Sequence, residues 1–208
     1  FVSNKSSGKQ GFEIASELTK RGAKVTLISG PVSIPFPNCE NIIQVKTAQE
    51  MLDSVSQQLP SDILICSAAV ADWKLIPKTK SNSKIETNTK IKKTNEKLLF
   101  ETLKNPDILE TISKSNLRPK IVIGFSAETD NLKKNAYSKL ISKNVDLIVA
   151  NDVSNGKVFG ADYNKVCLIE KNNFEQWETQ SKKSVAFNLV NKINDLLTNY
   201  NQRGIYAK

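Results

Sequence analysis

A chain of 208 residues with 39% hydrophobic content can bury one substantial core, so we expect a single globular domain over residues 1–208. The absence of histidine excludes Ser-His-Asp hydrolysis, histidine acid–base catalysis and histidine metal sites, and the three distant cysteines indicate neither a disulfide framework nor a cysteine metal site. The formal net charge of +9 comes mainly from lysine. Base reading in DNA relies on arginine, so we expect phosphate-bearing small molecules rather than nucleic acid as partners.

Neither a membrane segment nor a targeting signal is indicated. No apolar run approaches the ~20 residues that span a bilayer, and the first residues have no signal-peptide pattern. We therefore expect a cytoplasmic protein without a membrane partner. The sequence lacks an initiating Met and opens like the end of a strand, so we also expect it to be part of a longer protein.

Short β-branched runs alternate with stretches of helical periodicity along the chain. Strands are predicted at 25–28, 62–66, 120–125 and 146–150, and helices at 12–20, 48–59, 131–142 and 183–197. Near-continuous apolar runs indicate strands that are buried on both faces, as in a parallel sheet covered by helices. The predicted fold class is therefore α/β, with a Rossmann-like, open and mostly parallel sheet and helices on both faces.

Two regions break this alternation, and a hairpin follows them. Residues 74–97 are rich in Lys, Asn, Ser and Thr, and a polar stretch of this length is usually a functional flap, an extension or disorder. The segment 151–165 also has no apolar pattern for a core. Residues 165–173 read as a strand and turn, which predicts an antiparallel extension beside the sheet.

The first candidate site is the loop that follows the opening strand. Small hydroxyl residues and glycines occur between Ser3 and Gly11, before a helix predicted to begin near Phe12. Such a turn lets backbone amides approach a phosphate at the positive end of the helix. The spacing matches neither G-x-G-x-x-G nor a Walker A loop, so a plain polar turn remains the alternative. The candidate phosphate-loop residues are Ser6, Ser7, Gly8, Lys9 and Gly11.

Two further segments follow expected strand ends or close the flap. The small residues from Ser67 to Ala71 would let a base or ribose lie against the backbone, with Asp72 available for hydroxyls or a cation. A tightly packed strand end with a capping Asp is the alternative. The lysines of 90–93 could close over phosphates, although a solvated charge run is the commoner role of such a segment.

Later in the chain, residues 105–109 read as a helix start, with Pro106 near the first helical position. Lys139 and Lys143 stand four residues apart on a predicted helix, and hence on one face. Like charges at this spacing slightly destabilise a helix. An anion bound between the two lysines would explain the pair.

Taken together, these segments resemble the bacterial phosphopantothenoylcysteine synthetase family. The motifs run in order over residues 3–153 as S-N-x-S-S-G-K-x-G, V-T-L-I-S-G-P-V, A-A-V-A-D, K-I-K-K, N-P-D-I-L, G-F-x-A-E-T, K-x-x-x-K and L-I-V-A-N-D-V. The resemblance implies a ligase of coenzyme A biosynthesis. In that reaction CTP, with Mg²⁺, activates 4′-phosphopantothenate as an acyl-cytidylate, and cysteine then displaces CMP. It also implies an absent N-terminal half, an FMN-dependent decarboxylase, so FMN is not expected in this domain.

The resemblance implies roles for individual residues as well. Asn4 and Lys90 fall at the positions most closely tied to catalysis, and Lys84 is a rival to Lys90 because the flap is longer than is typical of the family. Trp73 and Ser126 depart from the family's usual Tyr and Ala. Family members are dimeric, so we expect a homodimer, within a larger oligomer if the decarboxylase is fused. The CTP-contacting positions are Cys66, Ser67, Ala68, Asp72, Lys90, Pro106, Asp107, Ile108, Leu109, Phe125, Lys139 and Lys143.

These roles are physically reasonable, and two other functions compete with them. Lys90 with Mg²⁺ would stabilise the transferring phosphoryl group, and the Asn4 amide would hold the acyl oxygen. A nicotinamide-dependent oxidoreductase would need a G-x-G-x-x-G turn and a following acidic residue, and neither is present in the right form. A non-catalytic nucleotide-binding module would keep every phosphate contact. Pyrophosphate release that depends on phosphopantothenate would separate the module from the enzyme.

Overall fold

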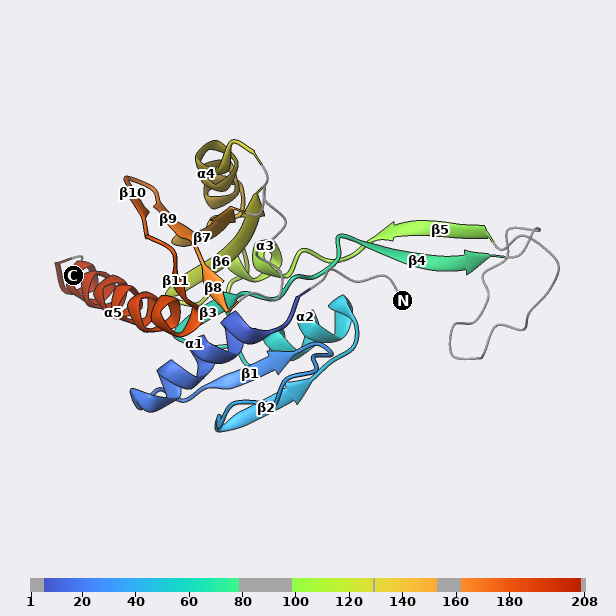
Figure 1. Ribbon diagram of the computed structural model, residues 1–208, viewed down its shortest axis with the longest axis horizontal. Helices are drawn as coiled ribbons and strands as arrows, with labels where there is room; N and C mark the ends of the chain where they lie inside the picture. The colour runs from blue at the N-terminus through green and yellow to red at the C-terminus, as the bar shows by residue number, and fades with distance from the viewer. Residues whose placement is uncertain (1–5, 79–98, 129, 153–161, 207–208) are drawn as a thin grey trace.

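The computed structural model describes residues 6–78, 99–128, 130–152 and 162–206. The helices and strands alternate along much of the chain, as the sequence predicts (Figure 1). In chain order they are α1 (Lys9–Lys20), β1 (Thr26–Ser29), β2 (Asn41–Gln44), α2 (Ala48–Gln57), β3 (Ile63–Cys66), β4 (Trp73–Lys78), β5 (Leu99–Lys104), α3 (Ile108–Ser113), β6 (Ile121–Glu128), α4 (Leu132–Ser142), β7 (Leu147–Asp152), β8 (Tyr163–Asn164), β9 (Val166–Glu170), β10 (Asn173–Gln176), β11 (Gln180–Ser181) and α5 (Lys182–Tyr206).

A mixed sheet of five strands lies at the centre, in the order β10-β9-β7-β6-β3. The neighbouring strands β3, β6 and β7 are parallel, whereas β9 runs antiparallel to β7 and β10 antiparallel to β9. The β9–β10 hairpin confirms the predicted antiparallel extension. Strands β1 and β2 pair in parallel with each other in a separate two-stranded sheet, and the sequence reading did not predict β2.

Alternate residues of the central strands pack against helices on opposite faces of the sheet, as the period of two requires. On one face, Ile123 and Val149 join a core with α1 and α5. On the other face, Val122 and Ile148 pack against α4. These two cores confirm the predicted Rossmann-like arrangement with helices on both faces. None of the helices in the described part of the chain is long and apolar enough to cross a membrane.

Helix α1 begins earlier than the sequence predicts. Its first residue is Lys9, so the prediction of a start near Phe12 is wrong by one turn. Gly8 caps the helix with a φ of 74°, a left-handed conformation that favours glycine. The turn is therefore shorter than predicted, and Gly11 belongs to the first turn of the helix. Helix α5 also runs past the predicted end at 197, and residues 198–202 are exposed, so they leave no buried apolar pattern for the sequence to show.

An antiparallel arm projects from the body of the molecule (Figure 1). It consists of β4 and β5, which pair from Trp73 opposite Lys104 to Lys78 opposite Leu99. The arm is the base of the predicted flap. The sequence reading missed β5 because most of its side chains are exposed and contribute no core pattern. Residues 79–98 lie outside the described residues, and so do the flap lysines Lys84 and Lys90.

Candidate functional site

A pocket of about 490 Å³ opens at the carboxyl ends of β3, β6 and β7. This edge of an open α/β sheet is where ligands generally bind. Asn4, like Lys90, lies outside the described residues. Every predicted site residue that the structure does describe lines this pocket, namely Ser6, Ser7, Gly8, Lys9, Gly11, Cys66, Ser67, Ala68, Asp72, Pro106, Asp107, Ile108, Leu109, Phe125, Lys139 and Lys143.

The start of α1 lies against the end of β3. A Cβ atom on Gly11 would be 2.7 Å from the Ser67 hydroxyl oxygen, so only glycine fits here without a shift. The hydroxyls of Ser6 and Ser7 accept from the backbone N–H groups of Gly8 and Lys9 at 3.4 Å each. The helix N-terminus, with its positive dipole end, therefore faces the same pocket as the turn after β3.

The turn after β3 is tied to the segment before α3. The backbone N–H of Asn105 donates to the Asp72 carbonyl at 2.7 Å, and its side-chain amide donates to the Ala71 carbonyl at 2.8 Å. Asp107 is the N-cap of α3 and accepts from the Glu110 N–H at 3.0 Å. Pro106 therefore precedes the cap and is not a helical residue. Two segments far apart in sequence form one wall of the pocket.

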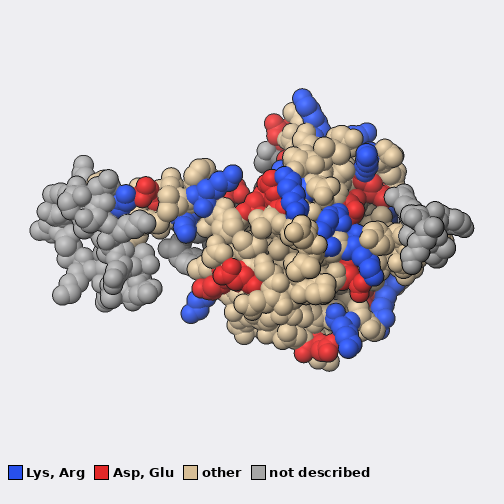
Figure 2. Space-filling model, turned by 180° about the vertical axis from the view of Figure 1, so that it is seen from behind, with Lys and Arg blue, Asp and Glu red and all other residues tan. Residues whose placement is uncertain are grey.

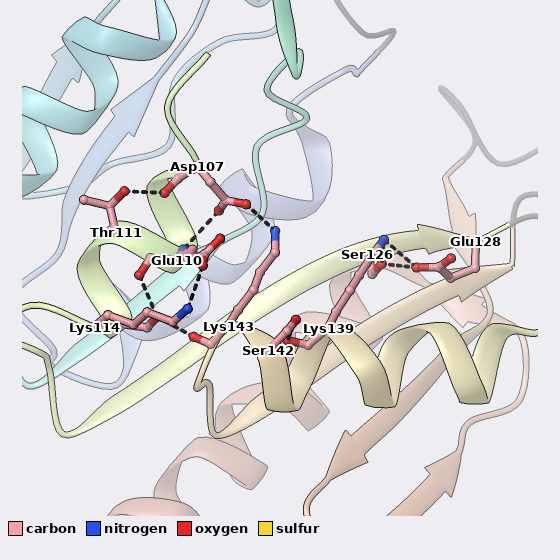
Figure 3. A network of polar contacts seen from close by, with 10 residues as sticks. Asp107, Glu110, Thr111, Lys114, Ser126, Glu128, Lys139, Ser142 and Lys143 are labelled. Carbon is pink, nitrogen blue, oxygen red and sulfur yellow. Dashed lines mark hydrogen bonds and ion pairs between the residues drawn. The ribbon is translucent and has the colours of Figure 1, made fainter. Parts of the chain in front are cut away.

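The two predicted lysines have separate carboxylate partners (Figure 3). Lys143 Nζ lies 2.7 Å from Asp107 Oδ2. Lys139 Nζ lies 2.7 Å from Glu128 Oε1 and 2.8 Å from Ser126 Oγ, and the Ser126 hydroxyl donates to the same carboxylate. Each ammonium is therefore compensated by a different acid in this structure, and the expectation of one anion between the two lysines stays a prediction.

These contacts keep both acids ionised. Burial acts to raise the pKa of Asp107, but Lys143 and the Glu110 N–H outweigh it, and the pKa is lowered. Burial also acts to raise the pKa of Glu128, and hydrogen bonds from Lys139 and Ser126 lower it overall. The α4 side of the pocket thus holds two pairs of opposite charges at neutral pH. An incoming polyanion would compete with the two carboxylates for the lysines.

Cys66 lines the pocket as a thiol rather than as a nucleophile. Burial raises its pKa to about 12, the Asp107 carboxylate adds to the rise, and Lys143 opposes it. Because the thiolate is the reactive form of cysteine, this side chain is unreactive at neutral pH. Cys66 therefore contributes packing at the end of β3.

Several surface lysines and arginines have acidic partners beside them, although the net charge of the chain is +9. Figure 2 shows Lys and Arg side chains beside Asp and Glu side chains rather than in one separate basic area. Lys120 pairs with Asp62 and Arg118 with Asp146, each at 2.7 Å. The pocket is therefore a better candidate than the rest of the visible surface for binding a phosphate-bearing ligand.

The described residues do not form a metal cage. No group of three or more Cys, Asp and Glu side chains in the described ranges could hold a metal ion. Asp72 and Asp107 line the pocket, and Asp107 is already paired with Lys143. Mg²⁺ is commonly bound through one or two carboxylates and substrate phosphates. These residues fit Mg²⁺ only as a companion of a phosphate ligand.

The sequence reading missed several polar residues of the same pocket. Asn151 lies in the L-I-V-A-N-D-V motif, and no role was predicted for it. Its place at the end of strand β7 was a signal that could have identified it. No such signal in the sequence identifies Lys182. It is adjacent to Lys183, and only the docking of α5 makes Lys182 buried and Lys183 exposed. The unpredicted polar lining residues include Gln10, Asn105, Ser126, Asn151, Asn164 and Lys182.

A second pocket lies elsewhere and contains none of the predicted residues. Its volume is about 780 Å³, and it lies between α4 and the β9–β10 hairpin. Lys133 lies over the Phe174 ring there, 4.6 Å from the ring centroid. No group in it matches the chemistry predicted from the sequence.

Comparison with known proteins relates this chain to one family. The family model described as "DNA/pantothenate metabolism flavoprotein C-terminal domain" matches residues 1–197. The chain is 41% identical over 194 residues to the coenzyme A biosynthesis bifunctional protein CoaBC of Haemophilus influenzae, covering 93% of this chain and 46% of that protein. The chain thus spans about half the length of the curated relatives it matches.

Solved structures share the fold. The crystal structure of the C-terminal domain of a coenzyme A biosynthesis bifunctional protein CoaBC superposes with a TM-score of 0.73 at 31% identity, covering 93% of this chain and 85% of that chain. A Cab2 variant in complex with phosphopantothenate-cysteine superposes with a TM-score of 0.66 at 15% identity, covering 100% of this chain and 82% of that chain. At such low identity, the second likeness is evidence of the fold alone.

Proposed function

The chain belongs to the family of the DNA/pantothenate metabolism flavoprotein C-terminal domain, and from this premise we propose that it is a phosphopantothenate–cysteine ligase of coenzyme A biosynthesis. One observation carries the proposal. The described residues at the predicted nucleotide positions come from four separate segments, and all of them line one pocket at the carboxyl edge of the sheet. The names of the relatives give the same pathway.

In the proposed first step, the carboxylate of 4′-phosphopantothenate attacks the α-phosphate of CTP. A new P–O bond forms, the bond to the β-phosphate oxygen breaks, and pyrophosphate leaves with its electron pair. Lys139 and Lys143 bind the triphosphate, and Lys90 closes over it from the flap. Positioning and charge stabilisation are the main demands of such a transfer, so no side-chain nucleophile is needed. Mg²⁺ bound to the triphosphate would add to this charge stabilisation, and Asp72 is the carboxylate of the pocket that could hold it.

In the proposed second step, the amine of cysteine attacks the acyl carbon of the acyl-cytidylate. The new C–N bond replaces the C–O bond to phosphate, CMP leaves, and the proton of the amine passes to solvent. We assign Asn4 to hold the acyl oxygen, because an amide can donate a hydrogen bond there without titrating. This role is compatible with a chain that contains no histidine.

We propose CTP rather than ATP as the nucleotide. The turn from Ala68 to Asp72 is held by backbone contacts with Asn105, and its small side chains leave backbone groups available to the edge of a base. A pyrimidine offers a hydrogen-bonding edge of suitable size. Equal or better turnover with ATP would overturn this assignment.

We also propose that the active form is a homodimer. Four large apolar side chains are exposed on the β4–β5 arm, namely Trp73, Leu75, Leu99 and Phe100. Exposed apolar surface on a projecting arm favours a protein contact. Sedimentation of the chain at micromolar concentration tests this proposal, and a monomer throughout would contradict it.

The experiment that tests the function uses the purified chain with CTP, Mg²⁺, 4′-phosphopantothenate and cysteine. Mass spectrometry should detect the coupled product only when all three substrates are present. Replacing CTP by ATP should reduce the yield strongly. CTP binding without any coupled product would instead identify a nucleotide-binding module.

A further inference from the structure

Lys182 is a buried lysine that has no ion-pair partner among the residues that the structure describes. It is the first residue of α5, is 8% exposed and lines the pocket. Its backbone is anchored, because its N–H donates to the Asp162 carbonyl at 2.9 Å and its carbonyl accepts from Gln10 Nε2 at 3.1 Å. Its ammonium forms neither an ion pair nor a hydrogen bond with the residues that the structure describes. Burying an unpaired charge is costly, so this position calls for an anion.

Three buried acceptors line the same pocket, and none of them has a donor in the described part of the chain. The side-chain oxygens of Gln10, Asn151 and Asn164 have no hydrogen-bond partner among the described residues. Asn164 is only 3% exposed. Buried polar atoms in folded proteins are nearly always satisfied. The pocket therefore fits a ligand that carries both an anionic group and hydrogen-bond donors.

These groups lie on the opposite face of the sheet from Lys139 and Lys143. Asn151 follows Val149 by two residues on β7, and Val149 belongs to the core with α1 and α5. Lys182 and Gln10 belong to those two helices, whereas α4, which carries Lys139, packs on the other face. The pocket thus has one group of cations on each side of the sheet edge.

The charges on the α1 side favour a phosphate over a weaker anion. Lys9 pairs with Asp162 at 2.6 Å, which leaves the charge of Lys182 uncompensated. Gly8, the N-cap of α1, has no side chain to cap the helix, and the Ser7 hydroxyl accepts from the Lys9 N–H at 3.4 Å, so the positive end of the helix still faces the pocket. Burial, with a contribution from Lys9, lowers the pKa of Lys182, and Asp162 opposes the change. One negative charge of a bound phosphate would compensate Lys182, and the positive end of α1 would stabilise the second charge of a phosphate dianion.

Resting on the proposed function, we propose that Lys182 and the first turn of α1 bind the 4′-phosphate of the acid substrate, while two of the three acceptors Gln10, Asn151 and Asn164 accept hydrogen bonds from its single hydroxyl and its single amide N–H. In 4′-phosphopantothenate these two donors lie only a few bonds from the phosphate, so one molecule compensates the charge and satisfies two of the acceptors together. The triphosphate of CTP then occupies the α4 side, near Lys139 and Lys143.

The test compares Lys182→Met with Lys183→Met. Lys183 is exposed, so the same change at the neighbouring position is a matched control. Lys182→Met should lower kcat/KM for 4′-phosphopantothenate by roughly 10- to 100-fold, as expected for the loss of a charge-assisted hydrogen bond. It should leave kcat/KM for unphosphorylated pantothenate, and KM for CTP and cysteine, unchanged. Its Tm without ligand should not fall, because the variant removes an unpaired buried charge.

Other patterns would overturn the subsite. An equal loss of kcat/KM with unphosphorylated pantothenate would show that Lys182 does not bind the phosphate. A selective rise in KM for CTP would assign Lys182 to the nucleotide, and a selective rise in KM for cysteine would assign it to the amino-acid carboxylate. Calorimetric titration separates this proposal from the proposed function. Even without turnover, the wild-type chain should bind 4′-phosphopantothenate more tightly than pantothenate, and Lys182→Met should lose that preference; a wild-type chain without the preference contradicts the subsite.

Discussion

Replacing Lys139 by Met tests the charge balance on the α4 side of the pocket. Glu128 is 7% exposed, and its carboxylate receives hydrogen bonds from Lys139 and Ser126. Met replaces the apolar stem of the lysine side chain but removes the ammonium. The carboxylate then stays buried with one strong donor fewer, so the folded state should be less stable.

The expected size of the effect follows from the exposure of the two groups. A hydrogen bond to a charged group contributes about 1.5–3 kcal/mol. Since the Lys139 side chain is 43% exposed, solvent screening reduces the loss to about 1–2 kcal/mol. For a chain of this length, each kcal/mol corresponds to a Tm change of about 2–4 °C. Lys139→Met should therefore melt a few degrees below the wild type at pH 7.

The difference in stability should depend on pH. The pKa of Glu128 is lowered in the folded protein, below its ordinary value of 4.5. Its contribution is therefore fully present above pH 4.5 and is lost as the pH falls through the folded pKa. In Lys139→Met, burial favours the protonated form of Glu128. Protonation at low pH therefore removes the cost of the buried carboxylate in the variant. The gap in Tm between wild type and variant should shrink from pH 7 toward pH 4.

Thermal melts at several pH values measure this directly, with Lys134→Met as the matched control on an exposed position of the same helix. Adding Glu128→Gln to Lys139→Met removes the buried charge and should recover most of the lost stability. A double variant as unstable as Lys139→Met, or a gap in Tm that is constant with pH, would refute the reasoning.

Three further predictions concern the pocket. A Cβ on Gly124 would lie 2.5 Å from Leu109 Cδ2. Gly124→Ala should therefore lower the free energy of unfolding by about 1–3 kcal/mol in a denaturant titration and weaken CTP binding. An unchanged free energy of unfolding and an unchanged CTP affinity would contradict the tight packing. Lys90→Ala should reduce pyrophosphate release by ~10²-fold or more, far more than Lys84→Ala, and the reverse ranking would identify Lys84 as the flap lysine. Asn4→Ala should abolish coupling while CTP still binds, and near-normal coupling would remove Asn4 from the mechanism.

The convergence of the site was predictable because it follows from topology. Lys139 and Asp107 are distant in sequence, yet both adjoin strands that end at one edge of a parallel sheet, and such edges gather functional side chains. The predicted strands were recognisable because burial on both faces leaves continuous apolar runs. Helix α1 was placed less well, since its start depends on the left-handed backbone of Gly8 rather than on an apolar pattern.

Other features depend on tertiary contacts that no local pattern encodes. The burial of Lys182 and the exposure of Lys183 are decided by how α5 docks on α1. The pairing of Lys143 with Asp107 required knowledge of which elements lie side by side. Strand β5 was missed because it pairs only with β4 in an exposed arm, where apolar residues serve no core. Sequence therefore located the pocket but not its charge pairs.

Pyrophosphate release in the absence of cysteine tests the central claim most directly. With CTP, Mg²⁺ and 4′-phosphopantothenate, each molecule of the chain should release about one molecule of pyrophosphate. Without 4′-phosphopantothenate there should be no release. Addition of cysteine should then convert this single release into continuous turnover with formation of the coupled product. Release of inorganic phosphate instead of pyrophosphate, or pyrophosphate release at the same rate without 4′-phosphopantothenate, would contradict activation of the acid as an acyl-cytidylate.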